Sequence, residues 1–283
     1  NVTINDSGAF DLAALTLTGN LSVTSGGAIS DSGVIDVDGT ASFTTGSANI
    51  DIDNATGNGL TGAVSFTTTG TGDVTFDNGT TAINLGTVMV GQNLSITSGD
   101  SITDSGVITV GGTAYFETDT SDKLITLNLQ NAITGQVTFN TTGTGGDVYF
   151  DNGTKAISLG TISSGDIAGD LILLTDADQT ISNAITLNGS GADLSITVDN
   201  ANSLTVQAAL TTNAGDITLS GEDDVIFTAA GDLTSGNGNI IVKADDDSTS
   251  DAASGGALTM VDGTIFNAGS GTITGTSDED ITL

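Results

Sequence analysis

Aspartate side chains offer the most chemistry in this sequence. The chain has 35 acidic residues, nearly all of them Asp, and hard cations such as calcium take oxygen ligands from Asp, Asn and backbone carbonyls. Two stretches concentrate these groups, DIDNATGNG from Asp51 and KADDDSTSD from Lys243. The candidate calcium ligands are therefore Asp51, Asp53, Asp245, Asp246, Asp247 and Asp251.

Calcium is one of two explanations for these stretches. Neither has the spacing of an EF-hand loop, and GTGGDVYF, which precedes Asp151, matches a calcium-binding nonapeptide only in part. The other explanation is that acidic turns are simply solvated. We therefore expect that no cofactor is required, with calcium as the alternative.

Catalysis is hard to build from this set of residues. Paired carboxylates such as Asp51 and Asp53 could in principle hydrolyse a glycoside, but solvated outer faces of strands are the strongly favoured explanation for them. The chain has no His and no Cys, and its basic residues are Lys123, Lys155 and Lys243, so it has no Ser-His-Asp triad and no imidazole base. We predict that the protein is not an enzyme.

The charge balance excludes several partners. Against 35 acidic residues the chain has 3 basic ones, which gives a formal net charge of −32. Nucleic-acid recognition depends on clusters of Lys and Arg, and an anionic membrane surface would repel an acidic chain. No apolar run approaches the roughly 18 residues that a membrane-spanning helix needs. We predict no nucleic-acid partner and no membrane insertion.

Two pairs of segments repeat at an offset of about 73 residues. TTGTGDVTFDNGTTAINLGT begins at Thr68 and TTGTGGDVYFDNGTKAISLGT at Thr141, while NLSVTSGG at Asn20 is matched by NLSITSGD at Asn93. These offsets predict sequence units at about 1–72, 73–146 and 147–283, within one elongated segment that covers residues 1–283.

A shorter period of about 23 residues appears where the long repeat fades. It places Asp170, Asp193, Asp216 and Asn239 in equivalent positions. Three columns of apolar residues keep the same spacing: Leu171, Leu194, Ile217 and Ile240; Leu173, Ile196, Leu219 and Val242; and Leu187, Leu210 and Leu233.

Within each short segment apolar and polar residues alternate, which is the pattern of a β-strand. Between the long copies the apolar set is held, since Phe76 reappears as Phe150, whereas Thr75 becomes Tyr149. The held residues are expected to face a core, and the variable ones solvent.

These patterns predict an all-β fold, a parallel β-helix or β-solenoid of roughly 20–24 residues per coil. A coil of that length cannot bury its own apolar face, so neighbouring coils must stack to enclose a continuous core. The chain has 40 Gly and no Pro, which suits sharp corners joined by strands that donate hydrogen bonds to their neighbours.

One signal favours a different fold. Asn-Gly pairs beside alternating residues are typical of β-hairpins, and they occur at Asn58, Asn78, Asn152, Asn188 and Asn237. They would suit tandem antiparallel β-sandwich modules of about 73 residues, although a sandwich gives no reason for the shorter period. The sandwich is therefore the alternative.

The texture of GNLSVTSGGAIS from Gly19 and GQNLSITSGDSIT from Gly91 resembles the repeat regions of bacterial filamentous-haemagglutinin-like adhesins and other giant β-helical surface exoproteins. The resemblance covers most of the chain and implies an extracellular or cell-surface location. That family's secretion domain carries an Asn-Pro-Asn-Leu motif, and this chain has no Pro, so only shaft repeats can be represented.

The sequence thus predicts a structural or adhesive segment of an extracellular or cell-surface filamentous protein that stacks end to end. Both ends read as strands, so the expected partners are other copies or a continuation of the same chain, together with surface glycans or the surfaces of host or neighbouring cells. The alternatives are a calcium-dependent acidic surface-layer module or a glycan-binding module and, less favoured, a polysaccharide-processing solenoid.

Overall fold

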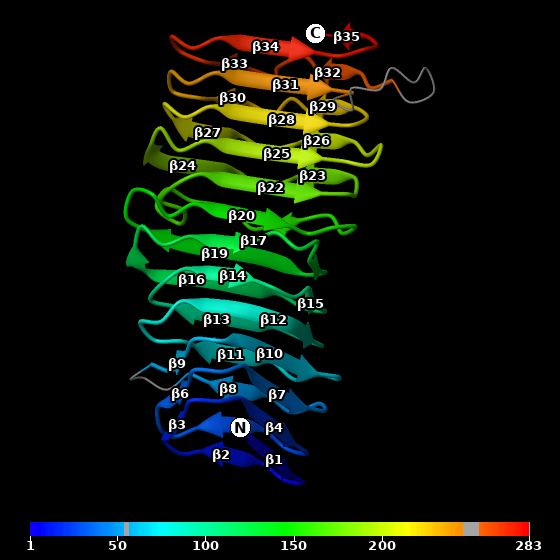
Figure 1. Cartoon of the computed structure of the whole chain (residues 1–283). Coiled ribbons are helices and arrows are strands. Elements are labelled where there is room, and N and C mark those ends of the chain that lie inside the picture. Colours follow the sequence, from blue (N-terminus) through cyan, green and yellow to red (C-terminus); the bar gives the residue numbers. More distant parts are fainter. Residues whose placement is uncertain (54–56, 246–254, 283) are drawn as a thin grey trace. The chain divides into compact units, whose positions relative to one another are not determined.

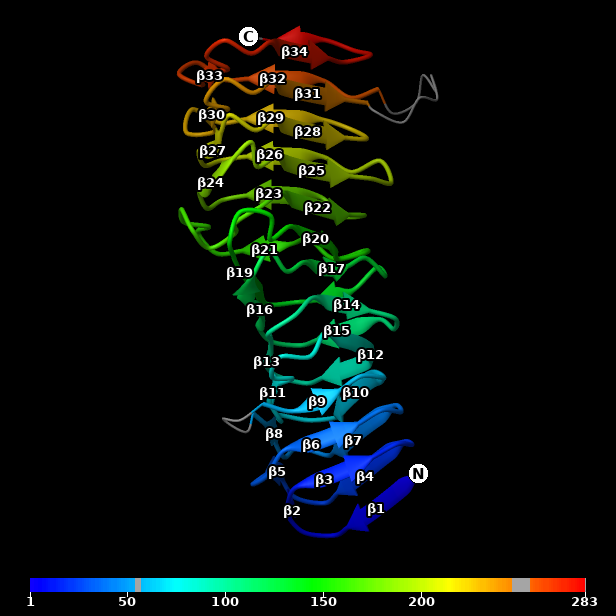
Figure 2. The same cartoon turned by 60° about the vertical axis from the view of Figure 1, so that its left-hand side comes forward.

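The computed structural model describes residues 1–53, 57–245 and 255–282, and every regular element in these ranges is a β-strand. The chain forms two compact units, Asn1–Asn140 and Thr141–Leu283. In each unit the chain winds in coils whose strands pair in parallel with those of the next coil (Figures 1 and 2). The predicted β-solenoid is therefore confirmed. Within the described ranges, no helix is long and apolar enough to span a membrane.

The first unit contains three columns of paired strands. One column is β1 (Val2–Asp6), β4 (Leu21–Ser25), β7 (Ala41–Thr45), β10 (Ala63–Thr68), β12 (Ile83–Val90), β14 (Ile102–Asp104) and β17 (Ile125–Leu127). The second is β2 (Phe10–Leu12), β5 (Ile29–Asp31), β8 (Ile50–Ile52), β11 (Val74–Asp77), β13 (Leu94–Ser98) and β16 (Ala114–Ser121). The third is β3 (Leu15–Leu17), β6 (Ile35–Val37) and β9 (Gly59–Leu60). β15 (Ile108–Val110) pairs with β12 and with β18 (Ala132–Ile133), and β19 (Gln136–Thr142) crosses the boundary between the units.

The second unit also contains three columns. The first is β20 (Val148–Asp151), β22 (Leu171–Thr175), β25 (Leu194–Val198), β28 (Ile217–Gly221), β31 (Ile240–Ala244) and β34 (Ile273–Thr276). The second is β23 (Gln179–Ile181), β26 (Leu204–Val206), β29 (Val225–Phe227), β32 (Leu258–Met260) and β35 (Ile281–Thr282). The third is β24 (Ile185–Ser190), β27 (Leu210–Asn213), β30 (Leu233–Thr234) and β33 (Phe266–Asn267). β21 (Ser158–Leu159) is a further short strand.

Alternate side chains of the strands fill the interior of each unit. In β7 and β10, Phe43 and Phe66 are buried, while Ser42 and Ser65 between the inward positions are half-buried on the outer face. Phe43 and Phe66 are register partners, and their rings stack with centroids 5.7 Å apart. Phe76 of β11 packs on Phe66 at 5.2 Å. The core of this column is therefore a ladder of buried apolar residues, one rung per coil.

Two of the three predicted apolar columns are confirmed by the strand register. Leu171, Leu194, Ile217 and Ile240 are aligned, as are Leu173, Ile196, Leu219 and Val242. The third is wrong at its first member, because Leu210 pairs with Ile185, and Leu187 pairs with Thr212. The register of β24 then shifts before Ser190, where two extra residues form a bulge. The coils that begin at β22 and β25 have the same length, but they divide their residues differently between corners and strands. The sequence period alone therefore misplaced β24.

The long repeat does not return each copy to the same column. The strand of NLSVTS, β4, lies in the first column of the first unit, whereas the strand of NLSITS, β13, lies in the second. Leu21 and Leu94 are buried in both settings. A repeat of about 73 residues is therefore not a whole number of coils, and the same sequence forms different faces of the solenoid.

The antiparallel sandwich is excluded by the parallel pairing of these strands. The Asn-Gly pairs that suggested hairpins have another role. Gly79 and Gly153 adopt positive φ values of 56° and 52° at corners of the coil. Positive φ is cheap only for Gly. Asn-Gly therefore suits both a hairpin turn and a corner of a solenoid, and the local sequence does not distinguish the two.

Truncating a ring in the Phe ladder tests this description of the core. Phe66→Ala should lower the free energy of unfolding of the first unit by about 3–5 kcal/mol, because it removes a large buried side chain and leaves a cavity. Hydrogen exchange of amides in residues 1–140, followed by NMR, measures the change. The control Ser65→Ala, on the outer face of the same strand, should change it by less than about 0.5 kcal/mol. Similar losses in the two variants would contradict the inward assignment.

Candidate functional site

The predicted ligands Asp51 and Asp53 lie at the end of β8. Asp51 stands between the buried residues Ile50 and Ile52, so its side chain points outward. Partial burial raises the pKa of Asp51, and the carboxylates of Asp53 and Asp31 raise it further. Among the described residues, no three His, Cys, Asp or Glu side chains form a group that could hold a metal ion. Calcium binding by this pair therefore stays a prediction.

The second predicted stretch begins where β31 ends. Asp245 has a positive φ of 59°, and its N–H donates to the carbonyl of Asp223 at 3.2 Å. Asp246, Asp247 and Asp251 lie outside the described residues. Calcium binding here is likewise a prediction.

The repeated DNGT motif builds a corner of the coil. Oδ1 of Asp77 accepts the N–H of Gly79 at 2.7 Å, and Oδ1 of Asp151 accepts that of Gly153 at the same distance. Burial raises the pKa of Asp77, although the bond from Gly79 lowers it. The carboxylates of both copies thus cap a tight turn, which is a familiar use of Asp.

The Asn of this motif turns into the core, where its amide replaces a backbone partner. Oδ1 of Asn78 accepts the N–H of Leu60 at 2.8 Å, and Nδ2 donates to the carbonyl of Leu60 at 3.0 Å and to that of Ala82 at 2.9 Å. Gln179 does the same for Ile157, whose N–H and carbonyl it bonds at 2.7 and 2.8 Å. From the sequence alone, Asn78 was expected only to mark a turn. The signal in the sequence is that Asn78 continues the alternation of the inward residues Val74 and Phe76.

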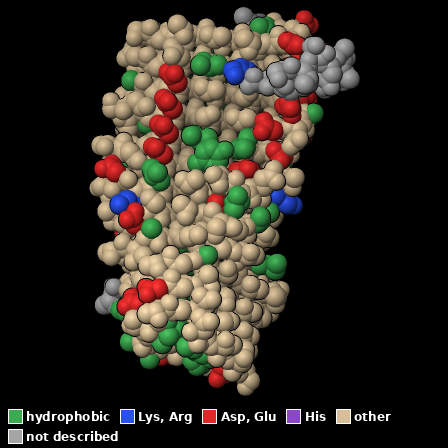
Figure 3. All heavy atoms as spheres, viewed as in Figure 1, with side chains coloured by type: hydrophobic (Ala, Val, Ile, Leu, Met, Phe, Trp, Pro, Cys, Tyr) green, Lys and Arg blue, Asp and Glu red, His purple; other side chains and the backbone are tan. Residues whose placement is uncertain are grey.

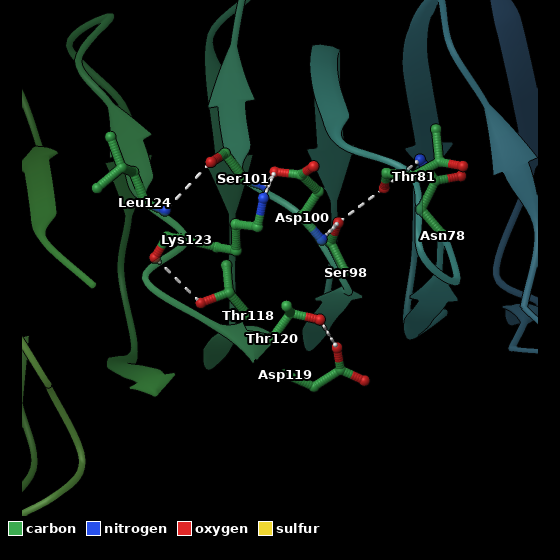
Figure 4. Close-up of polar contacts among 10 residues, drawn as sticks. All are labelled: Asn78, Thr81, Ser98, Asp100, Ser101, Thr118, Asp119, Thr120, Lys123 and Leu124. Atoms are coloured by element: carbon green, nitrogen blue, oxygen red, sulfur yellow. Dashed lines mark hydrogen bonds and ion pairs between the residues drawn. The ribbon is translucent and has the colours of Figure 1, made fainter. Parts of the chain in front are cut away.

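Polar contacts also join successive coils at another corner of the first unit (Figure 4). Nζ of Lys123 lies 3.0 Å from Oδ1 of Asp100, and this hydrogen bond lowers the pKa of Asp100. Oγ of Ser98 donates to the carbonyl of Thr81 at 2.8 Å, and the N–H of Leu124 donates to Oγ of Ser101 at 3.2 Å. Both side chains of the ion pair are about a third exposed, so the pair itself contributes little to stability.

In the second unit, a column of side-chain oxygens accepts one backbone N–H from each following coil. Oδ1 of Asp147 accepts from Asp170 at 2.9 Å, Asp170 from Asp193 at 2.8 Å, and Asp193 from Asp216 at 2.7 Å. Asp216 accepts from Asn239 at 2.7 Å. We call these residues the acceptor column. Figure 3 shows acidic side chains in a row where β22, β25 and β28 begin.

The acceptor column needs an oxygen and not a charge. In the first unit neutral Asn fills the same role beside Asp, since Asn93 accepts the N–H of Thr113 at 3.0 Å and Asp73 accepts that of Asn93 at 3.0 Å. Asn20 likewise accepts the N–H of Thr40 at 3.0 Å. The charges carry a cost. Burial raises the pKa of Asp170, and the carboxylates of Asp147 and Asp193 raise it further, while the N–H of Asp193 lowers it.

A cavity of about 430 Å³ opens on the second unit. Residues 141–144, 164–165, 167–168 and 188–190 contribute its lining. Ile167 and Ala168 form its buried apolar part, and the other lining residues are Thr, Ser, Asn and Gly. The cavity therefore presents hydroxyl, amide and peptide groups without a charged side chain.

Comparison with known proteins finds a similar repeat family for part of the chain. Residues 1–67 and 71–140 each match a family model described as repeats of unknown function (DUF5649). Together the matches cover a little under half of the chain, and both lie in the first unit. No curated protein and no solved structure matches the chain. The likeness is to a repeat family without an assigned activity, and it names no adhesin.

The buried amide of Asn78 is open to a direct test. Asn78→Ala should destabilise the first unit by about 1–3 kcal/mol, the usual cost of leaving a buried polar group without a partner. Denaturant titration followed by amide NMR measures the loss. Asn128→Ala, at an exposed position in the same unit, should change stability by less than about 0.5 kcal/mol. Equal effects would show that Asn78 acts only as a turn residue.

The acceptor column predicts a charge-independent role for Asp170. Its pKa is raised above the ordinary 3.8, so the folded state binds the proton more tightly than the unfolded state does. Its contribution to stability is therefore fully present below pH 3.8 and is lost as the pH rises through the folded pKa. Asp170→Asn should be at least as stable as the wild type at pH 7, whereas Asp170→Ala should lose about 1 kcal/mol.

Thermal unfolding between pH 3 and pH 7 measures both effects of Asp170. The advantage of Asp170→Asn over the wild type should shrink as the pH falls. Asp36→Asn, on the outer face of β6, removes one charge elsewhere and controls for net charge. If Asp170→Asn lost as much stability at pH 7 as Asp170→Ala, the charge would be essential and the assignment wrong.

Proposed function

We propose that this chain is a structural and adhesive segment of an extracellular or cell-surface filamentous protein. The observation that supports it most is the continuity of bonding between coils within each unit. Backbone pairing in register runs from coil to coil, and the acceptor column adds a side-chain bond at each step. Such an array resists bending and shear because each coil is fixed to both of its neighbours.

The side-chain inventory supports a scaffold over an enzyme. The sequence has no His and no Cys, and the carboxylates that we traced serve as turn caps and backbone acceptors. A strongly negative surface keeps such an array soluble and opposes lateral bundling at low ionic strength. Divalent cations or added salt should relieve this repulsion.

Exposed core positions support end-to-end stacking. Ile273 and Ile281 lie at inward positions of the last coil of the second unit and are 52% and 48% exposed. Ile240 is the register partner of Ile273 one coil earlier, and it is fully buried. We propose that a further coil, from the same long chain or from a second copy, covers these side chains.

Sedimentation velocity tests the stacking. The purified chain should associate as its concentration rises, and Ile273→Asp should weaken this association, because a charge on the contact face must be desolvated. Val107→Asp is the control, because Val107 is a 44% exposed apolar residue of the first unit outside that face. If the wild type stays monomeric at high concentration, or if both variants behave alike, this face is not the contact.

Location, adhesion and calcium are tested separately. In intact cells of the source organism, the segment should be cleaved by added protease and labelled by antibody, and the purified segment should bind to cell surfaces. Protection from protease until the cells are lysed would exclude an extracellular role. A melting midpoint that fell in EDTA and recovered with calcium would favour the calcium-dependent module over the plain scaffold.

A further inference from the structure

The cavity of the second unit lies where the regular solenoid breaks. The bulge in β24 places Asn188 and Gly189 outside the ladder, and the loop before β22 makes a small bridge of its own between Ser164 and Ile167. Gly143 and Gly165 adopt φ values of 99° and 101°, which only Gly adopts readily. Bulges and unusual backbone conformations are enriched at binding sites.

Hydrogen bonds hold the three segments together. Oγ1 of Thr141 donates to the carbonyl of Gly146 at 2.6 Å and accepts the N–H of Ala168 at 3.0 Å. Nδ2 of Asn188 donates to Oγ of Ser164 at 2.6 Å, which joins the β24 bulge to the loop. These bonds give the cavity a defined shape in the absence of a ligand, which limits the ordering cost of binding.

The lining chemistry selects a class of ligand. An ion would lose its hydration without gaining a paired charge, because no lining side chain is ionised. The one carboxylate of the loop, Asp166, accepts the N–H of Ser163 at 2.7 Å and is not part of the lining. A neutral molecule with many hydroxyl groups can instead form hydrogen bonds with Thr, Ser and Asn side chains and with the exposed peptide groups of the glycines.

We propose that this cavity is a binding site for a neutral saccharide unit. Its volume of about 430 Å³ falls within the range of roughly 300–1,000 Å³ found for small-molecule pockets. Asn188 and Ser164 orient the sugar hydroxyls, and the glycine backbones of residues 143, 165 and 189 allow it to approach closely. The site rests on the cavity alone and stands whether or not the scaffold proposal holds.

Saturation-transfer NMR on the full chain tests the site with four probes. Glucose and N-acetylglucosamine are neutral, glucuronic acid is an anion, and glucosamine is a cation. We expect saturation transfer to the neutral pair and little to the charged pair, with shifts in the amide signals of Gly165 and Gly189. No transfer to any probe at tens of millimolar, or stronger transfer to a charged one, would overturn the proposal.

Two variants locate the binding. Ser190→Phe fills the cavity from an exposed position. It should weaken binding by at least about tenfold, a loss of 1.4 kcal/mol. The control Ser182→Phe places the same ring on an exposed residue outside the lining, and it should bind as the wild type does. Asn188→Asp keeps the side-chain shape, should weaken neutral sugars, and should admit glucosamine. Asn188→Asp is the variant to use if Ser190→Phe does not fold. Unchanged binding in a folded cavity variant would contradict the site.

The saccharide test and the scaffold tests fail independently. A chain that binds no sugar can still stack through its last coil, and Ser190→Phe should leave sedimentation unchanged, because Ser190 and Ile273 lie on different strands. A chain that binds sugar and stays monomeric would retain the cavity site and lose the stacking proposal.

Discussion

Parallel stacking in register is the constraint on which the rest of this protein depends. Because Leu171, Leu194 and Ile217 must occupy one column, the residue at each inward position must pack on its register partners in the neighbouring coils. The same constraint fixes the corners, where strand ends leave N–H and carbonyl groups that water does not reach. Asn78 and Gln179 satisfy them with side-chain amides. The inward apolar residues and the corner amides thus both follow from the stacking of coils, the first through packing and the second through hydrogen bonding.

The acidity of the chain is better understood through this constraint than through metal binding alone. Several Asp side chains stand at strand starts because a short oxygen acceptor is needed there, and Asn fills the role where the charge is dispensable. Burial is the main cause of the raised pKa of Asp170, and the aligned carboxylates of neighbouring coils raise it further. The hydrogen bonds between coils form in spite of this repulsion.

Departures from the ladder are informative in a molecule this regular. The bulge of β24 displaces Asn188 and Gly189, and the cavity lies beside them. The change of column between β4 and β13 is a departure of another kind, which lets one repeated sequence contribute to two faces. A repeat array can therefore vary its surface without changing its core.

The sequence by itself determined the strands, their inward faces and the parallel stacking, because a period of two within strands and of about 23 between coils leaves few alternatives. It did not determine the pairing of Ile185 with Leu210, since moving two residues from a corner to a bulge keeps the coil length constant. Nor did it show that Asn78 turns inward, because a turn signal is local and its hydrogen-bond partners lie a coil away. Only the tertiary structure brought Thr141, Ser164 and Asn188 to one cavity, because their proximity depends on how many residues each corner takes up and not on any motif that they share.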